Sequence, residues 1–377
     1  MVVPARRRLD AVRKPEDFPW DVVKLGCELG LKGLPFPAEH GGSDADVATL
    51  AMVVEELAAG DLSIAYFFKH NWRFSRLVQR LPERLRGDII RRICVEPEYL
   101  PATAVTEIGC GSDNHVLSDD PAVGLRFSAV PDGDGWVLNG TKMMITNARM
   151  AGIYFVSART DPTVPVGAGA TMFAVPADTE GISYGEPYDK LGQRASIQCD
   201  VHFTGCRIPG DLAVSGIGEA MGTMRRGANI GSNLVNAAMS VGVARSAFQE
   251  ALQWSTQRLQ GGALICTHQV VSRDLGLMKV DIEAAQSYVL RAARLCDAMG
   301  RNMDEATAHG ANVFASEMVL RVARLGMEMF GGRGMMGEWP AEKIMRDALT
   351  LQHGFGTNPL MLISIGTAAA EQVLQAG

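Results

Sequence analysis

The sequence lacks both a long apolar run and the glycine-rich pattern that opens a dinucleotide-binding βαβ unit. No stretch approaches the roughly 20 uninterrupted apolar residues that a membrane-spanning helix requires. No G-x-G-x-x-G or P-loop run follows a strand-like segment, which argues against a Rossmann-type nucleotide site. We therefore expect neither a membrane span nor a Rossmann domain.

Cysteines in metal-binding or disulfide patterns are also missing. The chain has seven cysteines, an odd number, and no two of them are spaced as C-x-x-C. This usage is typical of reduced thiols in a cytoplasmic protein without a zinc site or a disulfide framework. We expect a cytoplasmic protein with no metal site. The cysteines are Cys27, Cys94, Cys110, Cys199, Cys206, Cys266 and Cys296.

An excess of basic residues is absent as well. The formal net charge is −6, from 36 Lys and Arg against 42 Asp and Glu, which argues against a nucleic-acid partner. One basic cluster lies near the start, and we expect it to be a solvated helix face or a terminus. No apolar segment of the signal-peptide type follows it. The cluster contains Arg6, Arg7, Arg8, Arg13 and Lys14.

Three segments differ in their hydrophobic pattern. Residues 1–101 carry helical periodicity, as at 46–57, where apolar residues recur every three or four positions. Residues 102–214 favour strands, at 125–130, 136–145, 153–159 and 171–175, with a hairpin signal in the run DGDG at 132–135. Residues 215–377 are helical again, with Pro340 and Pro359 placed to begin helices. The pattern predicts an α+β fold with segregated layers.

Two runs in the strand segment carry chemistry. The run TEIGCGSD at 106–113 offers backbone N–H groups and hydroxyls that suit a polar ring or a phosphate. The run NGTKMMITNA at 139–148 ends a predicted strand with a hydroxyl. Each run alone is typical of an ordinary turn or strand end.

Together these runs resemble the acyl-CoA dehydrogenase family, whose pattern is approximately T-E-x-G-x-G-S-D followed by G-x-K-x-W-I-T-N. The resemblance implies an N-terminal helical domain, a middle β-barrel or sandwich domain, a C-terminal four-helix bundle and FAD. It implies that Thr106 and Ser112, with Gly111 between them, bind the flavin pyrimidine ring and that Thr146 lies beside flavin N5. The family's tryptophan against the isoalloxazine becomes Met144, which is polarizable but not flat.

The C-terminal segment carries two further matches. The run RLQGG at 258–262 resembles R-x-x-F-G, with Gln269 at the expected interval, and implies that Arg258 grips the flavin pyrophosphate of a neighbouring subunit. The run MFGGRG at 329–334 resembles a glycine turn near the same FAD, formed here by Gly331 and Gly332. Glu328 replaces the glutamine expected before that turn, and Thr357 completes the implied cofactor set.

The family's catalytic base is missing from its usual place. The run RDALTLQHGFGT at 346–357 resembles the catalytic loop, and Phe355 occupies the position of the glutamate. Some members carry the base on the first long helix of the bundle, but residues 231–233 contain no carboxylate. The resemblance implies that the backbone N–H at this position donates to the thioester carbonyl, and Phe355 keeps that donor.

Other groups are candidates for the missing role. His353 is an alternative base because an imidazole titrates near neutral pH, although a loop histidine often forms only local hydrogen bonds. His70 and Arg73 are candidates to reach the acyl pocket, against the plainer interpretation of a helix surface. The family's substrate-binding arginine on the bundle helix is also out of register, since Arg225 and Arg226 come about two turns too early.

These observations lead to one main hypothesis and two alternatives. The main hypothesis is an FAD-dependent oxidoreductase that performs α,β-dehydrogenation of an acyl thioester with a non-standard base. The alternatives are a flavin-dependent eliminase, decarboxylase or desulfinase without net oxidation, and a degenerate subunit of a hetero-oligomer. Implied partners are acyl-CoA or an acyl carrier protein, an electron-transfer flavoprotein or oxygen as acceptor, and further copies in a homodimer or a dimer of dimers.

Overall fold

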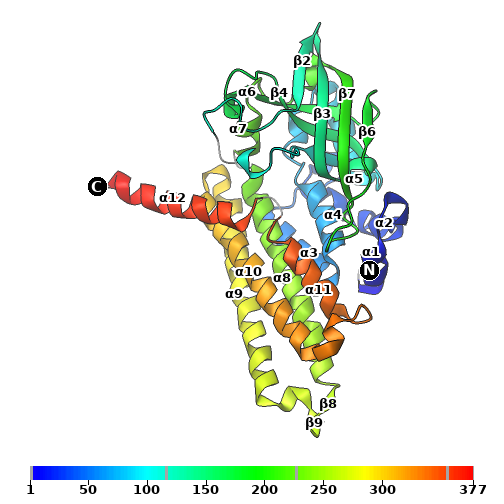
Figure 1. Ribbon diagram of the computed structural model, residues 1–377, viewed down its shortest axis with the longest axis vertical. Coiled ribbons are helices and arrows are strands. Elements are labelled where there is room, and N and C mark those ends of the chain that lie inside the picture. Colours follow the sequence, from blue (N-terminus) through cyan, green and yellow to red (C-terminus); the bar gives the residue numbers. More distant parts are fainter. Residues whose placement is uncertain (1–2, 115–117, 226–227, 354–355, 377) are drawn as a thin grey trace.

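The computed structural model describes residues 3–114, 118–225, 228–353 and 356–376. Helices form both terminal parts of the chain and a sheet lies between them, as Figure 1 shows. The predicted α+β fold is confirmed. The N-terminal helices are α1 Arg6–Ala11, α2 Trp20–Glu28, α3 Val47–Gly60, α4 Leu62–Trp72 and α5 Glu83–Val95.

A seven-stranded curled sheet occupies the middle of the chain. Its order is β1-β4-β2-β3-β7-β6, and β5 pairs with the other side of β4. β1 runs parallel to β4, whereas the long β3–β7 and β4–β5 pairs are antiparallel. The strands are β1 Leu100–Ala104, β2 Ser128–Asp132, β3 Gly135–Thr146, β4 Ala151–Arg159, β5 Ala170–Pro176, β6 Ile182–Tyr184 and β7 Gln198–Pro209, with the short helix α6 Val166–Gly169 before β5.

A helical bundle follows below the sheet in Figure 1. α8 packs against α9 and α10, α11 packs against α10, and α3 of the N-terminal part packs against α8. The β8–β9 hairpin lies at the end of the bundle far from the sheet, and α12 projects away from the body. The elements are α7 Ala220–Arg225, α8 Ala228–Ser255, β8 Leu259–Gln260, β9 Ala263–Leu264, α9 Gln269–Met299, α10 Glu305–Phe330, α11 Pro340–Thr350 and α12 Asn358–Ala376.

The helix predicted from periodicity at 46–57, the hairpin at 132–135 and the helix that begins at Pro340 are confirmed. The side chain of Asp46 accepts a 2.8 Å hydrogen bond from the Thr49 N–H and caps α3. The hairpin between β2 and β3 turns through Gly133, whose φ of +61° is costly for residues with a Cβ atom. Pro340 lies in the first turn of α11, where its missing N–H costs no helical hydrogen bond.

The strand predicted over residues 125–130 is wrong in extent, because β2 begins only at Ser128. The Glu107 carboxylate accepts hydrogen bonds from the N–H groups of Arg126, at 2.8 Å, and Phe127, at 3.1 Å. These donors are therefore satisfied by a side chain instead of a neighbouring strand. The apolar pattern there reflects burial of the segment without a sheet ladder.

The prediction that the whole basic cluster near the start is solvated is wrong for Arg6. Arg6 lies between α3 and α8, where its guanidinium donates to the Gly60 carbonyl at 2.9 Å and to Glu250 at 2.8 Å. Acceptors at the C-terminal end of α3 attract this cation. Arg8 remains exposed and pairs with Asp21.

A buried ionic cluster joins all three parts of the chain. Lys343 of α11 contacts Asp61, which caps α4, at 2.7 Å and Asp347 at 2.6 Å. Asp347 also accepts a 2.8 Å hydrogen bond from the Gln193 N–H in the loop after β6. Burial disfavours the Lys343 charge, but Asp347 and Asp61 outweigh it and raise the pKa of Lys343. Gly192 permits this approach, since a Cβ there would lie 2.6 Å from the Arg346 carbonyl oxygen.

Replacing Lys343 by methionine leaves two buried carboxylates without their cation. We expect the free energy of unfolding to fall by about 3–5 kcal/mol, because breaking a buried pair strands its partner charges. Urea denaturation followed by circular dichroism, at one protein concentration, measures this. Lys279→Met is the control: it removes an exposed pair with Glu283 and should cost less than about 1 kcal/mol. Equal losses in both variants would contradict a role for the cluster.

Candidate functional site

The loop at 106–113 is fastened to β3 by a buried ion pair. Glu107 contacts Lys142 at 2.7 Å, and the Lys142 ammonium also donates to the Val105 carbonyl at 3.0 Å. Burial lowers the pKa of Lys142 to about 8 although Glu107 acts in the opposite direction. The Met143 N–H donates to the Thr106 carbonyl at 2.9 Å. Thr106 is thereby held beside the end of β3.

The rest of this loop lies at the surface. Gly111 and Ser112 are exposed, so both are accessible to a bound molecule. The Gly111 N–H donates to the Asp113 carboxylate at 2.6 Å. This donor is therefore engaged within the loop, and the Ser112 and Thr106 hydroxyls are the side-chain groups that the loop can offer to a ligand.

A β-bulge separates Met144 from Thr146. The register between β3 and β7 shifts between Lys142 and Ile145, and Met144 takes a left-handed conformation with φ +57°. Met144 is 51% exposed, whereas Thr146 is buried and accepts a 3.0 Å hydrogen bond from the Gln198 side chain. Bulges often redirect side chains beside functional sites. Here the bulge gives an accessible apolar side chain next to a buried hydroxyl.

Helix α4 brings a second group of polar side chains to Thr146. The phenol of Tyr66 lies close enough to Thr146 for that hydroxyl to influence the pKa of the phenol, which burial raises. His70 stacks on Tyr66 with ring centroids 5.8 Å apart. His70 is only 2% exposed, and Arg73 is half-buried. The plainer prediction, that these residues form a helix surface, is wrong, because this face of α4 packs toward the sheet.

Burial and mutual repulsion disfavour charge on this face. Burial lowers the pKa of His70 well below 6.5, and the neighbouring Arg73 and Lys69 lower it further. Burial also lowers the pKa of Lys69 well below 10.5, and Arg73 adds to the effect. His70 is therefore a neutral imidazole at neutral pH, with one donor and one acceptor nitrogen.

The second group of predicted cofactor residues gathers at the far end of the bundle. The guanidinium groups of Arg258 and Arg333 lie 6.0 Å and 5.6 Å from the Trp254 ring centroid. Trp254 stacks on Phe330 at 5.2 Å and donates to the Met329 carbonyl at 3.0 Å. The turn that contains Gly331 and Gly332, both exposed, follows directly. The structure thus brings Arg258 and the glycine turn together.

Two other predicted residues lie near this end. Gln269 is exposed at the first position of α9. Glu328 pairs with Arg324 at 2.6 Å, so its charge is balanced within α10. Figure 1 places the β8–β9 hairpin opposite the sheet, so one chain does not bring Arg258 and Thr146 to a common site.

The predicted catalytic loop is described only at its edges. Phe355 lies outside the described residues. His353 is exposed at the end of the segment after α11, and Thr357 is half-buried just before α12. On α8, Asn233 occupies the region where a carboxylate was sought and is buried. The side chains of Arg225 and Arg226 lie outside the described part of the chain.

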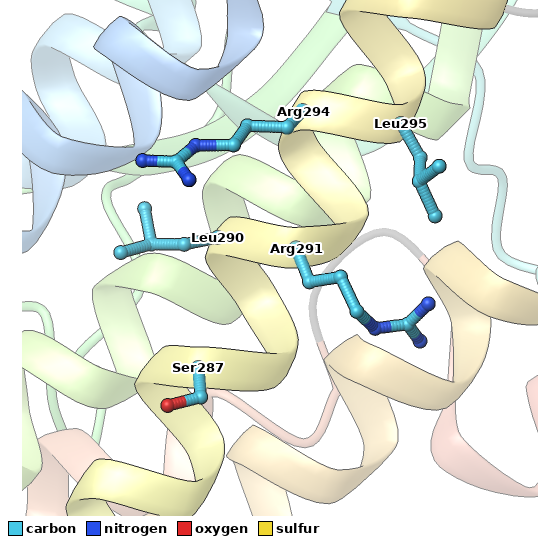
Figure 2. A pocket seen from close by; sticks show the side chains of 5 residues that line it. All are labelled: Ser287, Leu290, Arg291, Arg294 and Leu295. Atoms are coloured by element: carbon cyan, nitrogen blue, oxygen red, sulfur yellow. The ribbon is translucent and has the colours of Figure 1, made fainter.

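A surface pocket lies elsewhere, on α9. Its lining residues are Ser287, Leu290, Arg291, Arg294 and Leu295, and Figure 2 shows all five on this one helix. None of the predicted site residues lines it. Among the described residues, no cluster of three or more His, Cys, Asp or Glu side chains could hold a metal ion, and no helix has the length and apolarity of a membrane span.

The pH dependence of stability reports the neutral state of His70. Below pH 6.5 the unfolded imidazole takes up a proton that the folded protein resists, so wild-type stability falls as the pH falls. Relative to His70→Phe, we expect the wild type to lose about 1.4 kcal/mol per pH unit until the pH reaches the folded-state pKa. Urea denaturation between pH 7 and about 5 measures this.

Phe74→Leu is the control for this measurement. Phe74 packs against His70 with ring centroids 5.4 Å apart, so the substitution alters the same contact without removing a titratable group. It should keep the wild-type pH slope. If the free energy of unfolding of His70→Phe changed with pH as that of the wild type does, His70 would titrate normally in the folded protein.

Comparisons with known proteins agree with this architecture. Family models match residues 2–81 as the N-terminal domain, 102–206 as the middle domain and 231–370 as the C-terminal domain of acyl-CoA dehydrogenase. A probable acyl-CoA dehydrogenase of Bacillus subtilis, YngJ, is 32% identical over 93% of this chain and 89% of its own length. The probable acyl-CoA dehydrogenase FadE25 of Mycobacterium tuberculosis is 30% identical over 93% and 87%.

Solved structures give the same result. Butyryl-CoA dehydrogenase from Megasphaera elsdenii superposes with a TM-score of 0.87 at 28% identity, covering 98% of this chain and 94% of that one. A chain from the structure of the electron transferring flavoprotein of Acidaminococcus fermentans gives 0.88 at 28% identity, covering 98% and 93%. The chain therefore belongs to the acyl-CoA dehydrogenase family, whose members are flavoenzymes that act on acyl-CoA.

Proposed function

We propose that this protein is an FAD-dependent oxidoreductase that dehydrogenates an acyl thioester with a non-standard base. The observation that carries the proposal is the grouping of Thr106, Met144 and Thr146 around the end of β3. The ion pair between Glu107 and Lys142, 2.7 Å apart, holds the loop that carries Thr106 against β3. Hydroxyls and an accessible thioether side by side fit the polar edge and the apolar face of a flavin ring.

The other half of the FAD site belongs to a second copy of the chain. Arg258 and Arg333 place two guanidinium groups around Trp254, beside the exposed glycine turn. Two cations beside a backbone without side chains suit a diphosphate. Because these residues lie at the opposite end of the bundle from Thr146, we infer a homodimer or a dimer of dimers in which each FAD contacts two subunits.

The bound flavin would supply the acceptor for a hydride from the acyl chain. The chain's own residues would position the reaction. Thr146 would hold the flavin edge, and the family resemblance implies that the backbone N–H of residue 355, outside the described residues, would donate to the thioester carbonyl. His353 is the proposed base, since it precedes that residue by two positions. Acyl-CoA is the substrate class, with a carrier-protein thioester as the other form. We infer an electron-transfer flavoprotein or oxygen as the acceptor and a reducing compartment such as the cytoplasm, which suits seven free thiols.

A second candidate function follows from the missing carboxylates. Neither residue 355 nor residues 231–233 supply one. A thioester whose α-carbon loses CO₂ or another leaving group needs no proton abstraction there. A flavin-dependent eliminase, decarboxylase or desulfinase is therefore the alternative, and it would turn over without net electron transfer.

Loss of the Arg258 guanidinium should weaken FAD binding. We expect Arg258→Ala to raise the dissociation constant of FAD about 10- to 100-fold, the effect of one charge-assisted hydrogen bond. Visible absorbance and quenching of flavin fluorescence measure binding to the apoprotein. Arg273→Ala, at an exposed arginine near the same end of the bundle, is the control and should bind FAD as the wild type does. Unchanged affinity in Arg258→Ala would remove Arg258 from the cofactor site.

Flavin reduction tests the reaction and its base. Wild-type holoenzyme mixed anaerobically with butyryl-CoA should lose the visible absorbance of its oxidised flavin, and His353→Ala should slow this bleaching at least about 100-fold if His353 is the base. His40→Ala, which removes a half-buried histidine that pairs with Glu39, is the control and should bleach normally. Bleaching in both variants would eliminate His353. A stable FAD complex that no acyl thioester bleaches would favour the non-oxidising alternative.

A further inference from the structure

One face of α4 concentrates basic side chains inside the protein. Tyr66, His70 and Arg73 recur every three or four residues, and Lys69 lies beside them. This face packs toward the sheet: Tyr66 lies close to Thr146 of β3, and the Phe74 ring is 5.4 Å from the Phe155 ring of β4. The basic groups therefore lie between the helix and the end of β3, where the proposed function places the reacting acyl chain.

His70 is the clearest sign of a missing ligand. Its ring lies between Tyr66, at 5.8 Å, and Phe74, at 5.4 Å. Neither ring nitrogen has a hydrogen-bond partner among the residues that the structure describes. Buried polar groups are nearly always paired, and leaving both nitrogens unpaired costs stability. A ligand with hydrogen-bonding atoms would satisfy them.

The charge on this face selects the type of ligand. Burial, Arg73 and Lys69 lower the pKa of His70, and burial and Arg73 lower that of Lys69, so a neutral imidazole lies in the positive field of its basic neighbours. Electrostatic interactions are strong where water is excluded. An anion placed here relieves the repulsion and accepts hydrogen bonds from basic groups. An unsubstituted fatty acyl chain would do neither, and an apolar wall would serve it better.

Helix α8, which packs against α4, also carries buried amide groups. Asn236 is 6% exposed, and neither its oxygen nor its nitrogen has a partner within the described ranges. The side-chain oxygen of the buried Asn233 also has no hydrogen-bond partner among the described residues. Amide N–H groups donate readily to carboxylates. Two packed helices thus both carry buried polar atoms that the described residues leave unsatisfied.

We propose that Lys69, His70 and Arg73 form a subsite for a carboxylate at the distal end of the substrate's acyl chain, so that the enzyme prefers dicarboxylic acyl thioesters. The inference rests on the proposed function, because that function brings the acyl chain to Thr146. It goes further by naming the acyl class. His70 donates a hydrogen bond, while Arg73 supplies a permanent charge.

Matched pairs of thioesters test the proposal on the FAD-loaded wild type without any mutation. The pairs are succinyl- and butyryl-CoA, glutaryl- and pentanoyl-CoA, and adipyl- and hexanoyl-CoA, which share chain length and differ in the terminal carboxylate. Isothermal titration calorimetry measures binding. We expect the acid to bind at least about tenfold more tightly in one or more pairs, the range for a charge-assisted hydrogen bond. Tighter binding of the neutral member at all three lengths would overturn the proposal.

Variants identify the groups responsible. Arg73→Met and Lys69→Met should each reduce the preference for the acid, measured as the ratio of the two dissociation constants, toward unity. Arg80→Met, at an exposed arginine shortly after α4, is the control and should keep the wild-type ratio. Flavin content and circular dichroism verify folding of each variant. A preference that survives both substitutions would place the carboxylate elsewhere and overturn the assignment to α4.

The outcomes separate this inference from the function on which it rests. If neutral thioesters bind and bleach the flavin while acids bind no better, the subsite is wrong and the oxidoreductase stands. If no thioester of either kind binds to the FAD-loaded protein, the proposed function fails, and the inference fails with it.

Discussion

The cluster around Lys343 determines how the three parts of the chain meet. A buried ammonium between Asp61 and Asp347, at 2.7 and 2.6 Å, must keep both partners, because losing either would strand a charge in the interior. Asp61 caps α4 through the Ser63 N–H, and Asp347 accepts from the Gln193 N–H of the middle part. The orientation of α4 relative to the sheet is thus fixed by charge as well as by apolar packing.

A second buried pair does the same for the loop at residues 106–113. Glu107 and Lys142 hold residues 106–113 against β3, and the Glu107 oxygens use the backbone donors of Arg126 and Phe127. A contact between a lysine and a carboxylate therefore positions both α4 and the loop at 106–113. Such support lets side chains at the site adopt arrangements that would otherwise be unfavourable. Met144 with its positive φ is one of them.

Much of the fold was predictable because its causes are local. Periodicity and the Asp46 cap suffice for α3, and the DGDG run suffices for the β2–β3 hairpin. The strand at 125–130 was not predictable in extent, since its donors bond to Glu107, some 20 residues away in sequence. Periodicity also shows which residues share a face of α4 but not what covers that face, so burial of His70 required the structure.

The division of the predicted cofactor residues between two ends of the bundle gives the assembly a chemical role. A chain that folds alone presents Thr146 without Arg258, so neither end has a complete set of flavin contacts. In the proposed assembly, the subunit interface forms before the cofactor is fully held, and FAD in turn would link the subunits by mass action. The basic face of α4 differs, because Lys69, His70 and Arg73 come from a single helix. On these two proposals, one subunit would select the acyl group, whereas retention of the flavin would depend on two.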